Sequence, residues 1–269
     1  MVDPVISIRD LNVTLGGHPV LKGINLDVKR GEVLVLLGGS GAGKTTLLRQ
    51  IIGLEQPTSG AVYVQGVDIN HCSEKELKHI RRTMGVGFQE AALFGGLSTR
   101  ENVEMPMHEL TSLAEPVIGI MSYLKLAAVG LGDVCDFFPA ELSGGMKKRA
   151  AVARATALDP ELLIFDEPSA GLDPIVAAEL DELILSLKRL FQMTIVVITH
   201  EMASAFRIAD RIAFLCQGSL CAVQTKEAFQ TSTDPRIRQF IDRVPDRVVE
   251  SPAVQRHLRQ LAGIRGAGT

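Results

Sequence analysis

The run Gly38-Gly39-Ser40-Gly41-Ala42-Gly43-Lys44-Thr45 has the composition of a phosphate-binding loop. It matches the spacing G-x-x-x-x-G-K-[S/T], in which glycine backbone N–H groups close around phosphate oxygens. We expect Lys44 to reach the β- and γ-phosphates and the hydroxyl of Thr45 to bind Mg²⁺. An apolar run precedes the glycines and a helical pattern follows them, so a helix N-terminus would face the anion. The sequence therefore predicts a nucleoside triphosphate site.

A second candidate cluster lies more than a hundred residues later. Four apolar residues, 162–165, are followed by Asp166 and Glu167. A buried strand would carry both carboxylates to its C-terminal edge, where ligands bind in open parallel sheets. We expect Asp166 to hold Mg²⁺ and Glu167 to act as general base toward an attacking water. Two acids after a strand are a weak signal alone, but the upstream phosphate loop makes it strong.

Short apolar runs and helical patterns alternate along the chain and must position these residues. Strands are expected at 6–8, 24–28, 32–37, 61–64, 84–88, 162–165, 194–199 and 212–215. Helices are expected at 44–53, 143–158, 174–190 and 203–209, with a mostly helical insertion from 90 to about 132. Strands that alternate with helices indicate an α/β fold around a largely parallel sheet.

The composition excludes several classes of protein. The 269 residues carry a net charge of −3 and 22% charged side chains, as globular domains do. A pI near 6.1 gives no general basic field for nucleic acid. No apolar run approaches the ~20 residues of a membrane-spanning helix, and the N-terminus lacks a signal-peptide pattern. The four cysteines include no C-x-x-C pair, so neither a zinc site nor a disulfide framework is expected.

Further segments complete a recognisable series. Leu142-Ser143-Gly144-Gly145-Met146 lies between the phosphate loop and Asp166, and Gln89 ends an expected strand. Ser169-Ala170-Gly171-Leu172-Asp173 follows the two acids, and His200 follows another apolar strand. In this order the segments resemble the landmarks of ATP-binding cassette (ABC) ATPases over about residues 5–225. Each segment could arise by chance alone, but five in sequence order could not.

The resemblance implies a P-loop NTPase fold with a RecA-like parallel core, an antiparallel β subdomain and a helical subdomain. Residues 1–245 would form one ABC ATPase domain. Residues 90–157 would be the helical signature subdomain inserted in it, and residues 246–269 a C-terminal extension.

The resemblance also implies ATP and Mg²⁺ as cofactors and assigns the site. The catalytic residues would be Lys44, Gln89, Glu167 and His200, and the metal-binding residues Thr45, Gln89 and Asp166. Nucleotide would be bound by Leu15, Gly38, Gly39, Ser40, Gly41, Ala42, Gly43, Lys44, Thr45, Thr46, Ser143, Gly144 and Gly145. The last three start a helix, itself an anion-binding arrangement. They would serve ATP held by a second copy in a head-to-tail dimer.

Two positions depart from the family pattern. Met146 replaces the usual glutamine of the signature, a position that the backbone cradle does not need. Leu15 occupies the place of the aromatic residue that stacks on adenine. Leucine covers a base by dispersion but offers no ring stacking, so weak nucleobase selectivity is expected.

Finer details resemble the lipid-transport ABC ATPases of the Mla type, which work with MCE-domain proteins. These details are the segment 88–94, the methionine-ended signature, Asn102, Val103 and Pro106, and the segment 233–240. The run 169–173 departs from the gammaproteobacterial Mla form, so the resemblance is to the wider MCE-associated group. It implies phospholipid transport between membranes with an integral-membrane permease, an MCE-domain lipid-binding protein and a small STAS-type accessory protein. Nucleic acid would not be a partner, and the chain would lie peripherally on the cytoplasmic side of the inner membrane.

Three other functions remain open at this point. The chain could drive transport of a different substrate, or it could be a soluble ABC regulator acting on ribosomes or DNA. One cassette, no heptad run and an acidic balance weigh against the regulator. The third alternative is a P-loop kinase or GTPase, and a GTPase should carry an N-K-x-D base reader, which is not present.

Overall fold

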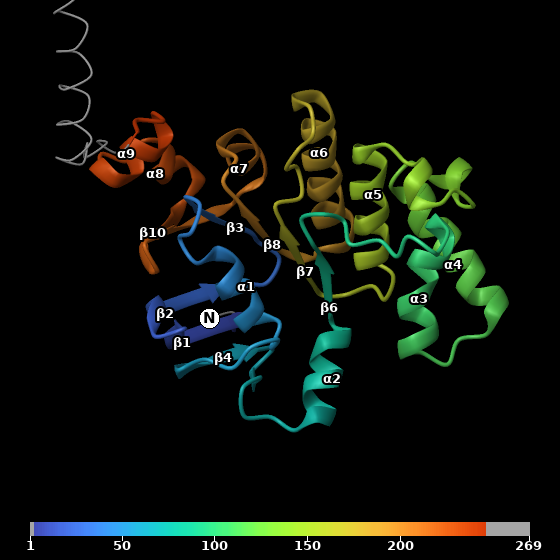
Figure 1. The fold of residues 1–269 in the computed structure, drawn as a ribbon, viewed down its shortest axis with the longest axis horizontal. Helices are drawn as coiled ribbons and strands as arrows, with labels where there is room; N and C mark the ends of the chain where they lie inside the picture. The colour runs from blue at the N-terminus through green and yellow to red at the C-terminus, as the bar shows by residue number, and fades with distance from the viewer. Residues whose placement is uncertain (1–2, 246–269) are drawn as a thin grey trace, which may run out of the picture. The chain divides into compact units, whose positions relative to one another are not determined.

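In the computed structural model, which describes residues 3–245, a six-stranded sheet contains five of the eight expected strands, and the other three lie in a second sheet (Figure 1). The order of the six-stranded sheet is β10-β9-β3-β8-β7-β6. The strands are β3 (Val33–Gly38), β6 (Met84–Gly87), β7 (Leu162–Asp166), β8 (Thr194–Thr199), β9 (Arg211–Cys216) and β10 (Ser219–Thr225). All pair in parallel except β10, which runs antiparallel to β9. The carboxyl ends of five strands therefore share one edge, where the loops after them meet.

The three middle strands are buried along their whole length. β3, β7 and β8 show no exposed residue, which explains their continuous apolar sequences. Leu34 and Leu36 of β3 join a core that also contains residues of the second sheet. Val35 and Leu37 alternate with them and face the opposite side of the strand. The central sheet is thus covered on both faces.

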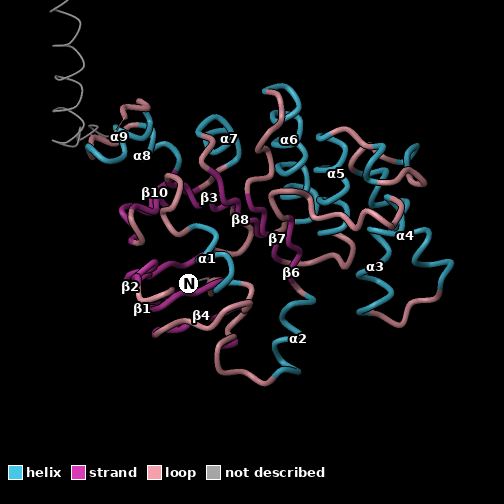
Figure 2. The backbone as a smooth tube through the Cα atoms, in the orientation of Figure 1, coloured by secondary structure: helices cyan, strands magenta, loops and turns pink. Residues whose placement is uncertain are grey.

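The second sheet is antiparallel, with order β2-β1-β4-β5. Its strands are β1 (Ile6–Leu15), β2 (His18–Val28), β4 (Ser59–Val64) and β5 (Val67–Asp68). Helix α1 (Lys44–Ile51) packs against β2, β3 and β4, and its Leu47, Leu48 and Ile51 belong to the shared core. The two sheets therefore hold the helix that follows the phosphate loop (Figure 2).

The helical insertion consists of α3 (Thr99–Leu110), α4 (Glu115–Ala128) and two short 3₁₀ turns, Gly132–Val134 and Pro139–Glu141. Helix α5 (Gly144–Ala155) follows them and packs against α3, α4 and β6. Helix α3 begins with a reciprocal capping box between Ser98 and Glu101, and Pro106 lies inside it rather than at its end. Figure 1 shows this helical region beside the β6 edge of the central sheet.

The remaining helices of the larger unit are α2 (Glu74–Arg82), α6 (Pro174–Phe191), α7 (Met202–Ile208) and α8 (Lys226–Gln230). Helix α2 and strand β10 were not among the expected elements. Helix α2 carries mostly charged residues, and its Ser73–Glu76 capping box was the available signal. Strand β10 is half-buried and mixes polar with apolar residues, so its alternation is weak.

The described chain separates into two compact units, one up to Thr231 and one from Ser232. In the second unit, helix α9 (Pro235–Ile241) begins at Asp234, whose carboxylate accepts a hydrogen bond from the Arg236 backbone N–H at 2.9 Å. The expected extension 246–269 lies outside the described residues. Within residues 3–245, every helix is too short or too polar to cross a membrane.

Candidate functional site

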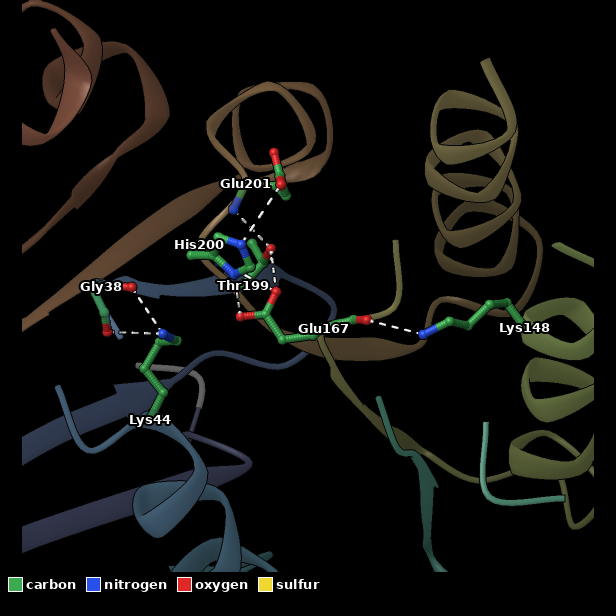
Figure 3. Close-up of polar contacts among 8 residues, drawn as sticks. Gly38, Lys44, Lys148, Glu167, Thr199, His200 and Glu201 are labelled. Carbon is green, nitrogen blue, oxygen red and sulfur yellow. Dashed lines mark hydrogen bonds and ion pairs between the residues drawn. The ribbon is translucent and has the colours of Figure 1, made fainter. Parts of the chain in front are cut away.

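The phosphate loop connects β3 to α1 and encloses the amine of Lys44. Nζ of Lys44 donates to the carbonyl oxygens of Gly38 at 2.8 Å and Gly39 at 3.1 Å, and the side chain is buried (Figure 3). Burial lowers the pKa of Lys44, while the charges of Glu167 and Asp166 oppose that shift. The ammonium group thus stands at the centre of the loop, facing two carboxylates.

At two positions of this loop, any side chain larger than that of glycine would clash with neighbouring atoms. A Cβ on Gly38 would lie 2.5 Å from the carbonyl oxygen of Leu215. Gly43 has φ +103°, and a Cβ there would lie 2.8 Å from Cδ2 of Leu21. The loop therefore packs directly on β9 and β2, which fixes its curvature. Ser40 and Thr45 are exposed, Thr46 is half-buried, and Ala42 is buried.

Asp166 and Glu167 emerge at the carboxyl end of β7, as expected, and each is 7% exposed. Burial is the main cause that raises the pKa of Asp166, followed by the neighbouring Glu167 charge; Lys44 lowers it in part. Glu167 has a left-handed backbone with φ +48°, held by a hydrogen bond of 2.8 Å from its N–H to the Ile198 carbonyl. Such a conformation in a non-glycine residue occurs where surrounding contacts enforce it.

The Glu167 carboxylate is bound by residues that follow β8. Nδ1 of His200 lies 2.7 Å from Oε1 of Glu167, and the Thr199 hydroxyl donates to Oε2 at 3.1 Å. The His200 backbone N–H also donates to Oε2 at 3.4 Å. The parallel pairing of β7 with β8 places these groups side by side. Figure 3 shows Glu167, Thr199 and His200 together, with Lys44 nearby.

Gln89 lies just after β6, exposed, and its carbonyl accepts a hydrogen bond from Nζ of Lys148 on α5. The same amine donates to the Glu167 carbonyl at 3.3 Å. Burial lowers the pKa of Lys148, against the opposing charges of Glu167, Asp166 and Glu90. Lys148 therefore connects the helical region to both the Gln89 loop and the catalytic candidate.

The signature segment stands apart from the phosphate loop of its own chain. Ser143 caps α5, with its hydroxyl accepting from the Met146 N–H at 3.3 Å. A Cβ on Gly145 would lie 2.6 Å from Cγ1 of Val176, so this glycine lets α5 approach α6 closely. Within residues 3–245, neither a hydrogen bond nor an ion pair joins Ser143 to Lys44, Asp166 or Glu167.

The run 169–173 leads into α6. The Asp173 carboxylate caps that helix by accepting from the N–H groups of Ile175 at 3.0 Å and Val176 at 3.1 Å. The Ser169 hydroxyl is buried and has no hydrogen-bond partner in the described part of the chain.

Leu15 ends β1 and is 45% exposed at the tip of the hairpin with β2, paired across it with His18. The hairpin lies beside the phosphate loop, because the carbonyl of Val20 comes within 3.3 Å of a Cβ placed on Gly43.

The donor set fits a magnesium ion accompanied by a triphosphate. Mg²⁺ takes oxygen ligands and is commonly held by one or two protein groups together with substrate phosphates. Asp166 offers a buried carboxylate whose ionised form burial disfavours, and Thr45 offers an exposed hydroxyl in the first turn of α1. The described residues contain no cluster of three His, Cys, Asp or Glu side chains that would bind a metal by itself.

Sequence reasoning missed three residues of this neighbourhood: Lys148, Thr199 and Arg154. Arg154 donates from α5 to the carbonyls of Ala91 and Ala92. Thr199 directly precedes His200 and could have been found from that adjacency. No sequence motif identifies Lys148 and Arg154, because their partners are backbone atoms some sixty residues away.

Comparison with known proteins identifies the family of this chain. The family model described as ABC transporter matches residues 21–170. The Escherichia coli K12 protein named intermembrane phospholipid transport system ATP-binding protein MlaF is 39% identical over 261 residues, covering 96% of this chain and 97% of the relative. The Mycobacterium leprae protein named probable ribonucleotide transport ATP-binding protein mkl is 40% identical over 237 residues, covering 88% of this chain and 68% of the relative.

Solved structures agree with the sequence matches. CbiO1 of Clostridium perfringens, part of an ABC transporter complex, has a TM-score of 0.79 at 30% identity, covering 91% of this chain and 96% of that one. The dimeric cassette MJ0796 in a post-hydrolysis state, bound to ADP and phosphate, has a TM-score of 0.74 at 30% identity, covering 82% and 98%. The expected family and fold class are confirmed. The chain therefore belongs to the ABC transporter family, as one of its ATP-binding ATPase subunits.

Proposed function

We propose that this chain hydrolyses ATP in the presence of Mg²⁺ to drive phospholipid transport between membranes. The observation that carries the hydrolytic part is the meeting of Lys44 with Asp166, Glu167 and His200 at one edge of the sheet. A cation for the phosphates, a carboxylate for the metal, and a second carboxylate for water are the parts that phosphoryl transfer to water requires.

The roles of the residues follow from their places. Lys44 and the N–H groups of 38–46 bind the phosphates, with Lys44 exchanging its carbonyl contacts for phosphate oxygens. Thr45, Gln89 and Asp166 hold Mg²⁺, which neutralises phosphate charge when bound. Glu167 accepts the proton of the attacking water, and Thr199 fixes one of its oxygens. His200, half-exposed beside Glu167, contacts the γ-phosphate.

The chain works as a head-to-tail pair of identical copies. Its signature residues Ser143, Gly144 and Gly145 lie at a helix N-terminus, which favours an anion. Within residues 3–245 they make no polar contact with the phosphate loop of their own chain, so the anion that they bind is ATP held by the second copy. Residues 1–245 form the ATPase domain, 90–157 its inserted signature subdomain and 246–269 an extension.

Leu15 covers the base of the bound nucleotide. A leucine contributes dispersion but no ring stacking, so selection of adenine over guanine is weak. GTP is therefore expected to compete with ATP for the site, with a Kd within about tenfold of the Kd for ATP.

Phospholipid is the proposed cargo because the phospholipid relative matches along nearly its whole length. The ribonucleotide relative is 40% identical, against 39% for the phospholipid relative, but about a third of it lies outside the match. Transport of a different substrate is therefore the second candidate. The partners are an integral-membrane permease, an MCE-domain lipid-binding protein and a STAS-type accessory protein. The chain binds the permease on the cytoplasmic side of the inner membrane.

The apolar stretch after Gln89 is the proposed contact with the permease. Phe94 is 47% exposed, while Leu93 and Leu97 are half-buried. Ala91 is buried, so it supports this surface from beneath rather than lining it. A helix that docks in a groove uses such apolar anchors.

Reconstitution tests the cargo. The chain is co-expressed with a candidate permease, and the complex is placed in vesicles whose membranes contain fluorescent phospholipid or whose interior contains labelled ribonucleotide. ATP-dependent transfer of phospholipid supports the proposal. Transfer of ribonucleotide alone supports the second candidate, and ATP hydrolysis with neither cargo moving contradicts phospholipid and ribonucleotide as cargo.

A further inference from the structure

The loop 88–98, which follows β6, contains a strained turn. Two backbone hydrogen bonds shape the loop, from the Ala91 N–H to Phe88 at 2.9 Å and from the Leu97 N–H to Phe94 at 3.1 Å. Between them, Ala91 and Ala92 adopt left-handed conformations with φ of +61° and +47°. Two consecutive alanines in this region are unfavourable, because each Cβ crowds the neighbouring carbonyl. Such a turn persists only where other contacts enforce it.

Arg154 supplies those contacts from α5. One guanidinium nitrogen donates to the Ala91 carbonyl at 2.8 Å and another to the Ala92 carbonyl at 2.7 Å. The planar fork of arginine suits two adjacent acceptors, and a lysine ammonium does not reproduce it. The guanidinium carbon also lies 5.8 Å from the centre of the Phe94 ring. One side chain therefore binds both strained residues and the exposed aromatic that follows them.

The rest of the loop is also bound to the helical region. The Asn102 side chain of α3 is fully buried. It accepts from the Phe94 N–H at 2.8 Å and donates to the carbonyls of Phe94, Leu97 and Ser98. At the other end, Lys148 of α5 donates to the Gln89 carbonyl. The loop is thus attached to α3 and α5. Within residues 88–98, Ala91 and Ala92 are the non-glycine residues with a positive φ, and Arg154 binds both.

We propose that Arg154 is a positioning residue that sets where Gln89 and Phe94 stand relative to the signature helix. The inference rests on the proposed roles of those two residues. Gln89 lies two residues before the strained turn and Phe94 two residues after it, so relaxation of the turn displaces both. Arg154 lies on the helix that Ser143 begins, so it links the signature segment to the γ-phosphate side of the site.

Four variants test the proposal: Arg154→Leu, Arg154→Lys, Ala92→Gly and the double variant Arg154→Leu/Ala92→Gly. Ala92 is exposed, so its replacement leaves the core intact. Glycine adopts a positive φ without steric cost, so it should let the turn persist when Arg154 is lost. Arg149→Leu is the control, because Arg149 lies on the same helix but pairs with Glu179 at 2.5 Å and leaves the loop untouched.

Two measurements are made on each variant of the full chain. Hydrogen exchange reports on the amides of 88–98, and steady-state kinetics with Mg·ATP gives kcat and KM. Arg154→Leu should speed exchange in the loop ~10-fold. It should lower kcat ~10-fold, with KM for ATP within about twofold, because a displaced group costs rate more than binding at the phosphate loop. Arg154→Lys should fall between, and Arg149→Leu should match the parent.

Ala92→Gly decides between positioning and general support. The double variant should regain most of the lost kcat and loop protection if Arg154 acts by holding the turn. The proposal is overturned if Arg154→Leu folds with unchanged exchange and kcat, or if glycine restores neither. A parent chain without ATPase activity would refute the proposed function, while the exchange data would still judge the contact between Arg154 and the turn.

Discussion

Nδ1 of His200 lies 2.7 Å from Oε1 of Glu167, so the residue after β8 and the residue after β7 form one unit. The buried carboxylate is thereby oriented at one oxygen by the imidazole and at the other by the Thr199 hydroxyl. An oriented carboxylate at the sheet edge is what a general base for water requires, since proton transfer depends on geometry before pKa.

Glu167→Gln should lower kcat for ATP about 10²-fold or more while nucleotide binding survives. Glutamine keeps the shape and the acceptor for Thr199 but cannot take the proton. Turnover of Mg·ATP and retention of radiolabelled ATP on gel filtration measure the two effects. The control is Glu201→Gln, because the Glu201 carboxylate is half-exposed and lies 3.7 Å from Nε2 of His200. Near-parent turnover in Glu167→Gln would show that Glu167 is not the general base.

Lys44→Ala should abolish ATP binding, because the triphosphate loses its main cation. It also removes the two bonds that Nζ makes within the loop, at 2.8 and 3.1 Å. Isothermal titration with Mg·ATP should show no heat above dilution. Lys22→Ala is the matched control, because the Lys22 ammonium group donates to the exposed Gln217 carbonyl at 3.1 Å, beside the same loop but outside it. Parent-like titration of Lys44→Ala would contradict the phosphate-binding role.

Mixing Lys44→Ala with Ser143→Arg should restore part of the ATPase activity that each variant lacks alone. In a head-to-tail pair, one composite site collects both lesions and the other keeps an intact phosphate loop and signature. The activity of mixtures at fixed total protein measures this, with each variant mixed with itself as the blank. Chains that work singly would leave every mixture inactive.

Phe94→Asp should leave the chain folded and able to bind ATP but unable to co-purify with the permease. Phe94 is 47% exposed, and the Asn102 side chain binds both its backbone N–H and its carbonyl. A charge at this position therefore disturbs the surface and not the core. Leu190→Asp is the control, at a residue 75% exposed near the end of α6. Unfolding of Phe94→Asp, seen in thermal melts, would place the ring in the core instead.

Asp166→Asn should stabilise the nucleotide-free chain at pH 8 while abolishing Mg·ATP hydrolysis. Burial raises the pKa of Asp166, so its ionised form costs stability in the folded chain. This cost is full above the raised pKa and disappears as pH falls through it, because the native carboxyl takes up a proton. Denaturant unfolding at pH 8 and at pH 4 should therefore show a gain from asparagine that shrinks at the lower pH. An equal gain at both pH values would contradict the cause.

The phosphate loop, the two acids and the signature could be predicted because their chemistry depends on residues adjacent in sequence. Gly38 to Thr45 must be contiguous to close around phosphates, and a buried parallel strand reads as an unbroken apolar run. The order of strands and helices then indicated an α/β sheet. Helix α2 was not predicted, because its mostly charged sequence buries few residues and the capping box was its main sequence signal.

Which distant groups meet depends on strand pairing and helix packing. The parallel pairing of β7 with β8 brings Glu167 to Thr199 and His200, and sequence order alone does not specify that neighbour. Lys148 and Arg154 act on carbonyl oxygens of the loop 88–98, and every residue has such an oxygen, so no residue pattern could reveal their partners. The chemical groups of the site can be recognised from the amino-acid order, because they reside in side chains and local turns. Their mutual distances come from strand pairing and helix packing, which depend on contacts across the whole chain.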